Sequence, residues 1–511
     1  MQNIRYVIFS CLFWGLILRI LYLYRPGVEA HKKTIEQLES KKYQIKLLVV
    51  VAATILMCIL PMGVSPIWNG TIEESRNQYE IMAESIKNGH IYLDYGWIDP
   101  LLLEMENPYD PELRTELGVT FQWDHAFYNG HYYMYFGVVP VFLLFFPYLL
   151  LTGTSLTTYR ATQIFVGLFI AGVFAVFYLL AKKFFPKMSP IMYVSLAVAF
   201  SVMSVWYSVG APALYCTAIT SALCMEIWSF YFFINAVWIE DDQNIGIRYA
   251  FCGSLLGALA FGCRPPIALA NLLVLPLLYE YLRKRKIDLK LVGQLIFAAL
   301  PYIVIGILLM VYNYVRFDNV FEFGQSYQLT VADIYNYADS VKIDAVTLLS
   351  KIISNFFGYK SLTTEFPYVS YNGVMINFPI LWFILIGLGQ ENVWKTMKEK
   401  KCRFFVGVLL ALPVIITVLD TMWSPYLLER YRMDIYWLMG IAVFFIIGLY
   451  YMNLSEEGQY RASFMFFILS IITIMVSVLL FLLPHDGNFT MVYPEVLETI
   501  RQLISFGRGT N

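Results

Sequence analysis

The stretch FQWDHAFYNGHYYMYFGVVP, residues 121–140, places several hydrogen-bonding side chains directly before an apolar run. Asn129-Gly130 lies between two aromatic runs of period two, which is the strongest short-range signal for a two-residue hairpin turn. Alternate residues of a strand share a face, so the turn predicts one hydrogen-bonding face and one apolar face. The hydrogen-bonding face consists of Asp124, Tyr128, His131, Tyr133 and Tyr135, and the apolar face of Trp123, His125, Phe127, Tyr132, Met134 and Phe136.

The hydrogen-bonding face suits a sugar, because tyrosine offers both a stacking surface and a hydroxyl group. A membrane interface also collects tyrosine and tryptophan without any ligand, so both interpretations of the tyrosines stay open. An interfacial belt does not need an aspartate. Asp124 is therefore the residue of this stretch that favours a sugar-handling site.

A second group of candidates lies in TIEESRNQYEIMAESIKNGH, residues 71–90. Its apolar residues recur at i, i+3, i+4 and i+7 from Tyr79, which predicts an amphipathic helix along the membrane surface. Thr71 with Glu74 fits a capping box, and Ser75 with Gln78 fits another one turn later. Glu74 is thus either a helix cap or a functional carboxylate, Glu73 beside it is a further candidate, and Tyr79 is the candidate substrate-binding residue of this stretch.

Four arginines border predicted membrane segments and could hold a phosphate, because a guanidinium matches phosphate oxygens bidentately. They are Arg264, Arg316, Arg430 and Arg432. Arg264 precedes two prolines that must break a helix, and a charge at such a break is costly unless it is paired or hydrated. The alternatives are a snorkelling side chain for Arg264 and internal ion pairs for the others, such as Glu429 with Arg432 or Arg430 with Asp434.

The elements that must position these residues are membrane helices. The chain has 511 residues, 59% hydrophobic and 14% charged, with a mean hydropathy of +0.61, which no soluble surface of this size could tolerate. A formal net charge of -1 lacks the basic excess of a nucleic-acid binder. We expect an all-α polytopic membrane protein with about 11–13 spanning helices, since each span needs ~20 apolar residues.

Measured against that length, the sequence gives eleven apolar runs as expected spans, and two more are ambiguous. The eleven are 46–64, 160–181, 189–209, 213–237, 248–262, 266–282, 291–315, 373–389, 403–420, 433–452 and 462–483, and the ambiguous ones are 6–24 and 136–153. Lysine and arginine gather in cytoplasmic loops, which places 65–135 and 316–372 outside as two sizeable loops. The basic group at Lys182, Lys183 and Lys187 joins the cytoplasmic side only if 136–153 makes no net crossing.

The expected organisation is one membrane domain over residues 46–484. Residues 1–45 precede it as a membrane or interfacial helix with a basic loop, and 485–511 follow as an extracytoplasmic tail.

Taken together, five segments resemble the polytopic C-type glycosyltransferases, the superfamily of protein O-mannosyltransferases and aminoarabinose transferases, and most of all its uncharacterised bacterial members. The segments are NQYEIMAESIKNGHIYLD after an acidic stretch, WDHAFYNGHYYMYFGVVPVFLLFFPYLLLTG, GCRPP, NYVRFDNVFEFG and ERYRMDIYWL. They lie within residues 46–452, most of the chain, and each motif alone is moderately specific.

The resemblance implies a polyprenyl-phosphate-linked sugar donor, a cell-envelope glycan, lipid or protein as acceptor, and catalysis on the outer face of a bacterial plasma membrane. A carboxylate would take the proton of the acceptor hydroxyl, and arginines would stabilise charge on the departing phosphate. No cofactor is implied, and no acidic cluster has convincing spacing for a divalent metal.

The identity of the base stays open between Glu74 and Asp124, with Glu73 behind them. Better-known members carry an Asp-Glu pair four and three residues before the tyrosine that matches Tyr79, where this chain has Ser75 and Arg76. Position in the family favours Glu74. A helix N-terminus keeps a carboxylate ionised but makes it a weaker base, which favours Asp124.

Two alternatives to an enzyme remain. A transporter or flippase of a lipid-linked glycan would carry ionisable residues near mid-membrane and broken helices in related halves, whereas most charges of this chain lie in loops and no repeat is visible. A non-catalytic scaffold of the same fold is the other alternative.

Overall fold

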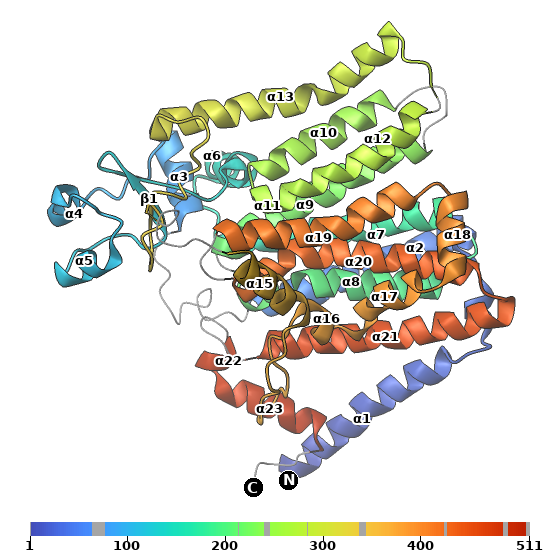
Figure 1. Cartoon of the computed structure of the whole chain (residues 1–511). Helices are drawn as coiled ribbons and strands as arrows, with labels where there is room; N and C mark the ends of the chain where they lie inside the picture. The colour runs from blue at the N-terminus through green and yellow to red at the C-terminus, as the bar shows by residue number, and fades with distance from the viewer. Residues whose placement is uncertain are drawn as a thin grey trace.

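The computed structural model describes residues 2–63, 77–212, 214–239, 246–283, 285–336, 344–423, 427–483 and 489–506. The chain is an all-α polytopic membrane protein, and among the described residues ten helical segments are long and apolar enough to cross a membrane. Most of them run side by side across Figure 1.

Nine of these segments contain one long helix each, and the tenth is broken. The nine are α1 (Gln2–Leu23), α2 (Lys41–Met62), α7 (Thr158–Phe184), α8 (Pro190–Gly210), α9 (Leu214–Ile234), α13 (Leu289–Phe317), α19 (Arg403–Trp423), α20 (Met433–Met452) and α21 (Glu456–Leu482). The tenth joins α11 (Pro265–Ala268), η5 (Leu269–Leu273) and α12 (Val274–Arg283). The first of the two ambiguous runs, 6–24, is thus a full-length helix.

Two expected spans fall short of a membrane-spanning length. The run 248–262 forms α10 (Ile247–Phe261), which ends before Pro265 and Pro266 because proline cannot continue a helix. The run 373–389 divides into α16 (Val374–Asn377), η6 (Pro379–Trp382) and α17 (Phe383–Leu388), with Pro379 at the break.

The second ambiguous run, 136–153, does not make a crossing helix. It holds the π-helical turn η3 (Val141–Phe145) and α6 (Phe146–Thr152), which together are too short to span. An ion pair of 2.8 Å joins Lys182 Nζ to Glu39 Oε1, so the basic loops on both sides of this segment lie at the same end. Residues 136–153 therefore make no net crossing, as a cytoplasmic position of Lys182, Lys183 and Lys187 requires.

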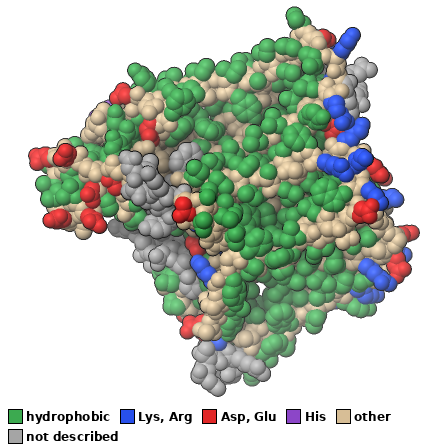
Figure 2. Space-filling view, viewed as in Figure 1, with side chains coloured by type: hydrophobic (Ala, Val, Ile, Leu, Met, Phe, Trp, Pro, Cys, Tyr) green, Lys and Arg blue, Asp and Glu red, His purple; other side chains and the backbone are tan. Residues whose placement is uncertain are grey.

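Helix α20 forms the centre of the bundle. It is apolar on all sides, and 89% of an 18-residue apolar stretch of the segment Glu429–Met452 is buried, which is typical of a core helix. Helix α13 is the opposite case. Only 6% of an 18-residue apolar stretch of this helix is buried, so most of its surface faces lipid. Lysines and arginines gather at the end of the bundle drawn at the right of Figure 2, and many acidic side chains lie at the other end.

The other end carries a small sheet of order β2-β1-β3, built from β1 (His125–Tyr128), β2 (His131–Tyr133) and β3 (Gln328–Leu329). The hairpin register is the expected one, with Tyr128 opposite His131 and Ala126 opposite Tyr133. Asn129 and Gly130 both have positive φ, 47° and 74°, as a type I′ turn requires. Strand β3 comes from the second loop, and the sequence did not predict it.

The predicted amphipathic helix is α3 (Gln78–Lys87), which buries Tyr79, Met82 and Ala83. Its N-cap is Asn77, whose side chain accepts from the amides of Tyr79 and Glu80. The expected caps at Thr71 and Ser75, and the candidate bases Glu73 and Glu74, lie outside the described residues.

The remaining helices lie at the two ends of the bundle. They are η1 (Glu29–Lys32), η2 (Ile35–Glu39), α4 (Pro100–Glu104), α5 (Pro111–Glu116), η4 (Asn235–Ile239), α15 (Ala345–Phe357), α18 (Glu391–Glu399), η7 (Glu429–Arg432), α22 (Phe489–Val492) and α23 (Pro494–Ile504). Helix α23 packs on α1, where Ser10 Oγ and Trp14 Nε1 donate to the carbonyls of Leu503 and Ile504. Helix α23 of the C-terminal tail is thereby docked on the first helix.

Candidate functional site

A cavity of about 460 Å³ opens where the sheet meets the helix ends, a size typical of small-molecule sites. The hairpin, the start of α9, the break before α11, residues 323–334, the end of α19 and η7 all contribute to its wall. Its polar and charged lining residues are Asp124, Tyr135, Tyr215, Arg264, Gln325, Gln328, Thr330, Asp420, Arg430 and Tyr431.

The wall of the cavity needs a glycine at position 137. The amide of Val139 donates to the carbonyl of Gly262 at 3.0 Å, which brings the segment after the hairpin against the end of α10. A Cβ at Gly137 would lie 2.2 Å from the Gly262 carbonyl oxygen. Only glycine allows this close backbone approach, and it joins the FGVVP and GCRPP stretches into one surface.

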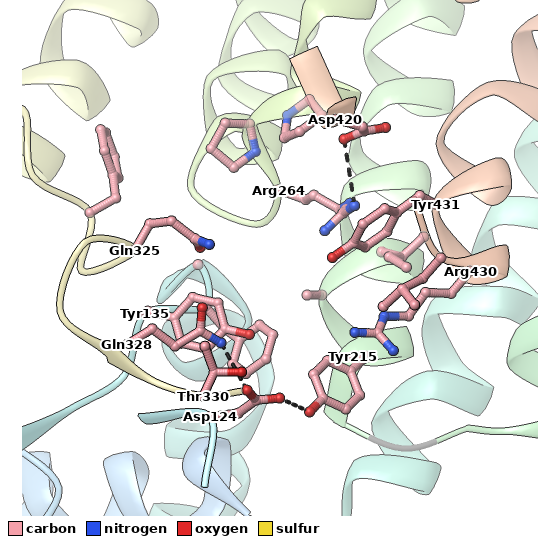
Figure 3. Close-up of a pocket in the computed structure, with 18 of the residues that line it drawn as sticks. Asp124, Tyr135, Tyr215, Arg264, Gln325, Gln328, Thr330, Asp420, Arg430 and Tyr431 are labelled. Carbon is pink, nitrogen blue, oxygen red and sulfur yellow. Dashed lines mark hydrogen bonds and ion pairs between the residues drawn. The ribbon is translucent and has the colours of Figure 1, made fainter. Parts of the chain in front are cut away.

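The backbone of Asp124 is held in an unusual conformation directly before β1. Its φ of 55° is in the left-handed region, which aspartate tolerates better than most residues. The Asp124 amide donates to the Leu329 carbonyl at 2.9 Å, and Gln78 Nε2 donates to the Asp124 carbonyl at 2.6 Å. These bonds from β3 and α3 turn the carboxylate toward the cavity (Figure 3).

The Asp124 carboxylate accepts from two neutral donors. Gln328 Nε2 donates to Oδ1 at 2.9 Å, and the Tyr215 hydroxyl donates to Oδ2. An ionised carboxylate has about four acceptor sites, so lone pairs remain for a further donor in the cavity. Asp124 is 8% exposed, and its surroundings therefore hold it in one orientation.

Arg430 is the cation that faces this carboxylate across Tyr215. Its guanidinium carbon lies 4.0 Å from the centre of the Tyr215 ring and 5.4 Å from that of Tyr431. Among the described ion pairs, none gives Arg430 a carboxylate partner. Its positive charge therefore stays available to an anion in the cavity.

Arg264 also lines the cavity, but its charge is already neutralised. Its Nε and Nη2 donate to both carboxylate oxygens of Asp434 at 2.7–3.0 Å, and Nη2 lies 3.9 Å from Asp420 Oδ1. The alternative of an ion pair between Arg430 and Asp434 is not found among the described ion pairs, because Asp434 pairs with Arg264. The alternative pair of Glu429 with Arg432 is not found among them either, and Glu429 pairs with Lys360 at 3.3 Å.

Three members of the hydrogen-bonding face of the hairpin do not reach the cavity. Tyr128 packs on Tyr327 with ring centres 4.6 Å apart, and Tyr133 packs edge-on against Phe317. His131 stacks on Tyr92 at 4.4 Å. Aromatic rings from the first loop, the second loop and the end of α13 therefore cover this part of the face.

Three other candidates are buried outside the cavity. Tyr79 stacks on Phe145 of η3. Arg316 donates from Nη1 to the Met134 carbonyl at 2.6 Å and from Nη2 to Asn313 Oδ1 at 2.8 Å, which ties the end of α13 to the hairpin. Arg432 points to the other side of η7, where its Nε donates to Asn355 Oδ1 at 3.3 Å.

Two neighbours of Asp124 outside the membrane-spanning helices have shifted pKa values. Burial, together with the nearby Asp124 carboxylate, raises the pKa of Tyr135 well above its usual value, so its phenol stays protonated beside the cavity. Burial lowers the pKa of His125 to about 4. The His125 Nδ1 contacts the Trp123 carbonyl at 2.7 Å, which only accepts, so the neutral ring donates there and accepts from Tyr95 at Nε2.

Sequence reasoning missed six polar lining residues. They are Tyr215, Gln325, Gln328, Thr330, Asp420 and Tyr431. Asp420 ends the apolar run 403–420, and an ionisable residue within a membrane segment is a functional candidate by default. No local pattern identifies Gln328, because its place depends on the pairing of β3 with β1.

Comparison with protein-family models, with curated proteins and with solved structures finds no match to this chain. The resemblance to C-type glycosyltransferases therefore stays a prediction from the motifs. Among the described residues, no group of three or more His, Cys, Asp or Glu side chains could hold a metal ion.

Proposed function

We propose that the protein is a membrane glycosyltransferase that moves a sugar from a polyprenyl-phosphate-linked donor to a hydroxyl group of a cell-envelope acceptor. One observation carries the proposal. A single cavity holds a buried carboxylate, Asp124, and a guanidinium without a described carboxylate partner, Arg430, bridged by Tyr215. Sugar transfer from a phosphate needs both groups at once, a base for the acceptor and a cation for the leaving phosphate.

The reaction follows from these two groups. The acceptor oxygen bonds to the anomeric carbon of the sugar while the bond from that carbon to the phosphate oxygen breaks. Asp124 takes the proton from the acceptor hydroxyl, and the phosphate leaves with the electron pair, facing Arg430. The products are the glycosylated acceptor and the polyprenyl phosphate, and the protonated Asp124 then returns its proton to water.

Among the candidate bases, Asp124 is the one whose surroundings are described. Its carboxylate is oriented by Gln328 and Tyr215 and lines the cavity. Arg430 is preferred over Arg264 as the phosphate ligand, because Asp434 already occupies the Arg264 guanidinium. We assign Arg264 the role of holding α20 against the broken segment that begins at Pro265.

The location of the cavity fits a lipid donor. The cavity lies at the end of the bundle opposite the basic loops, where Lys182 and Glu39 pair. Positive loops remain cytoplasmic, so the proposal assigns the cavity to the extracytoplasmic face of the plasma membrane. A donor anchored in the bilayer would then bring its phosphate to the height of the helix ends.

The test uses the full-length protein purified into liposomes. It is supplied with a panel of radiolabelled polyprenyl-phosphate sugars and an extract of cell-envelope acceptors, and label in the acceptor is measured. We expect transfer from at least one donor by the wild type and none by Asp124→Asn at equal protein level. Label that changes sides of the membrane without transfer would replace the enzyme by a transporter.

A further inference from the structure

Asp420 is a second buried carboxylate in the wall of the cavity, and the proposed reaction does not use it. It lies in the last turn of α19, and its side chain is 6% exposed. The C-terminal end of a helix carries a partial negative charge, which disfavours a carboxylate. The helix that positions Asp420 therefore does not stabilise its charge.

The cation beside Asp420 is largely taken by another carboxylate. Arg264 Nη2 lies 3.9 Å from Asp420 Oδ1, beyond hydrogen-bonding distance, but 2.7 Å from Asp434 Oδ2. The neighbouring hydroxyls of Thr417 and Thr421 donate to backbone carbonyls of α19. Among the described residues, none donates a hydrogen bond to the Asp420 carboxylate. Since an ionised carboxylate has about four acceptor sites, those of Asp420 are open to donor groups that enter the cavity.

Asp420 and Asp124 lie at opposite ends of the residues drawn in Figure 3, and Arg430 lies between them. In the proposed reaction the anomeric carbon is placed between Asp124, which receives the proton of the acceptor, and Arg430, which faces the phosphate. The end of the cavity beside Asp420 is then left for the other carbons of the sugar.

Two neutral side chains of the second loop, Gln325 and Thr330, also line the cavity. The hydrogen bonds described for these two residues use their backbone carbonyls, which accept from Gln328 and Arg114. Their amide and hydroxyl groups can both donate and accept, whereas the Asp420 carboxylate accepts only. A wall of this kind suits sugar hydroxyls, which donate and accept, better than a metal ion or an ammonium group, which needs acceptors alone.

We infer that Asp420 accepts hydrogen bonds from hydroxyl groups of the donor's sugar that are remote from the anomeric carbon, and that it thereby determines which sugar is transferred. The inference rests on the proposed function. A sugar with a hydroxyl at the matching position satisfies the buried carboxylate. A sugar without that hydroxyl leaves the acceptor unpaired, and this penalty is what allows a polar site to discriminate strongly.

The test compares Asp420→Asn with a control that loses a carboxylate elsewhere. Asp420→Asn keeps the size of the side chain and leaves Arg264 paired with Asp434. Asp318→Asn is the control, because Asp318 is exposed, does not line the cavity, and has a φ of 55° that asparagine also tolerates.

The probes are polyprenyl-phosphate-linked glucose, mannose, galactose and glucosamine. Each sugar is also supplied in forms that lack one hydroxyl remote from the anomeric carbon. For the donor that the wild type uses best, kcat/KM is compared with that of each deoxy form.

We expect the wild type and Asp318→Asn to prefer the complete donor over at least one deoxy form by about 10–100-fold, the range of a hydrogen bond to a charged group. Asp420→Asn should reduce that preference to within about threefold. An unchanged preference in Asp420→Asn, or an equal reduction in Asp318→Asn, would overturn the inference and leave the proposed function intact. An effect of Asp420→Asn confined to glucosamine would overturn it in favour of an ammonium site.

A second measurement separates the two claims if no donor supports transfer. Binding of the same glycosylated lipids to the three proteins is then measured by native mass spectrometry, with unglycosylated polyprenyl phosphate as the comparison. Tighter binding of a glycosylated lipid by the wild type and Asp318→Asn, but not by Asp420→Asn, would support sugar recognition although the enzyme proposal had failed. Equal binding of glycosylated and unglycosylated lipid by the wild type, or the same difference in all three proteins, would overturn the role of Asp420 as well.

Discussion

The two ends of the hairpin at residues 123–135 share sequence character but differ in surroundings. At the open end, Asp124 and Tyr135 line the cavity. At the turn end, Tyr128, His131 and Tyr133 pack against rings of other segments. The difference teaches that a shared face is necessary but not sufficient for a shared site, because distance along the strand decides which residues reach the cavity.

The turn η7 repeats this contrast at shorter range. Arg430 and Arg432 are two residues apart, yet Arg430 lines the cavity and Arg432 lies against Asn355. A 3₁₀ helix has three residues per turn, so positions two apart point in different directions. Substitutions at the two ends of the hairpin and on the two sides of η7 therefore both test whether only the residues that line the cavity contribute to sugar transfer.

The largest expected effect is at Asp124. Asp124→Asn keeps the size of the side chain but removes the proton acceptor, so the transfer rate should fall about 10²–10⁴-fold. Initial rates of sugar transfer at saturating donor measure this loss. A variant that transfers within a factor of two of the wild type would end the assignment of Asp124 as base.

Arg430→Gln should rank second, because it removes the charge that faces the leaving phosphate. Losing one donor to a transition-state oxyanion costs about 10²–10³-fold in rate. Arg432→Gln is the control from the same turn, and its transfer per folded molecule should stay close to that of the wild type. Equal losses of transfer per folded molecule in the two variants would show that Arg430 and Arg432 do not differ in function as described.

Tyr215→Phe should have a smaller effect. The variant keeps the ring under the Arg430 guanidinium and loses the hydroxyl that donates to Asp124. One hydrogen bond to a charged group is worth about 1.5 kcal/mol, which corresponds to roughly tenfold in rate. A steady-state transfer assay detects such a change, and an unaltered rate would remove Tyr215 from the positioning of the carboxylate.

The pH dependence of the hairpin tests its buried face. His125 titrates at about 4 in the folded protein, below its ordinary 6.5, so its contribution to stability is complete above about pH 6.5 and declines as the pH falls toward 4. The size is at most about 3 kcal/mol. Hydrogen-exchange protection factors of residues 121–136, which correct for the slower intrinsic exchange in acid, should therefore fall as the pH is lowered over this range in the wild type, and His125→Gln should lack that part of the pH dependence.

Tyr128→Phe should have the smallest effect. Its hydroxyl contacts Asp318 at 3.4 Å in an exposed position, far along the strand from the cavity. We expect transfer within about twofold of the wild type, since exposed polar contacts contribute little. A loss comparable to that of Asp124→Asn would show that the turn end belongs to the site.

Much of the fold follows from local patterns in the sequence. Apolar length indicated the long helices, Asn129-Gly130 indicated the turn and its register, and the spacing from Tyr79 indicated α3. Two of the predicted spans were wrong: the run 248–262 is too short to cross a membrane before Pro265 and Pro266, and the run 373–389 was counted across Pro379, which divides it.

The site was predicted less completely. Asp124, Tyr135, Arg264 and Arg430 were among the candidates and line one cavity. The partners of these residues depend on contacts between segments far apart in the chain, such as Gln328 with Asp124 across 204 positions and Arg264 with Asp434 across 170. A local sequence pattern cannot reveal such a pair, because its two members lie far apart in the chain.

The central claim is that Asp124 and Arg430 divide the chemistry of one cavity between a base and a phosphate ligand. A single-turnover experiment on the wild type, Asp124→Asn and Arg430→Gln, with donor binding and sugar transfer measured on the same samples, tests it most directly. The account predicts that Asp124→Asn binds donor like the wild type and fails to transfer, while Arg430→Gln binds donor more weakly. Transfer by Asp124→Asn at the wild-type rate would contradict it.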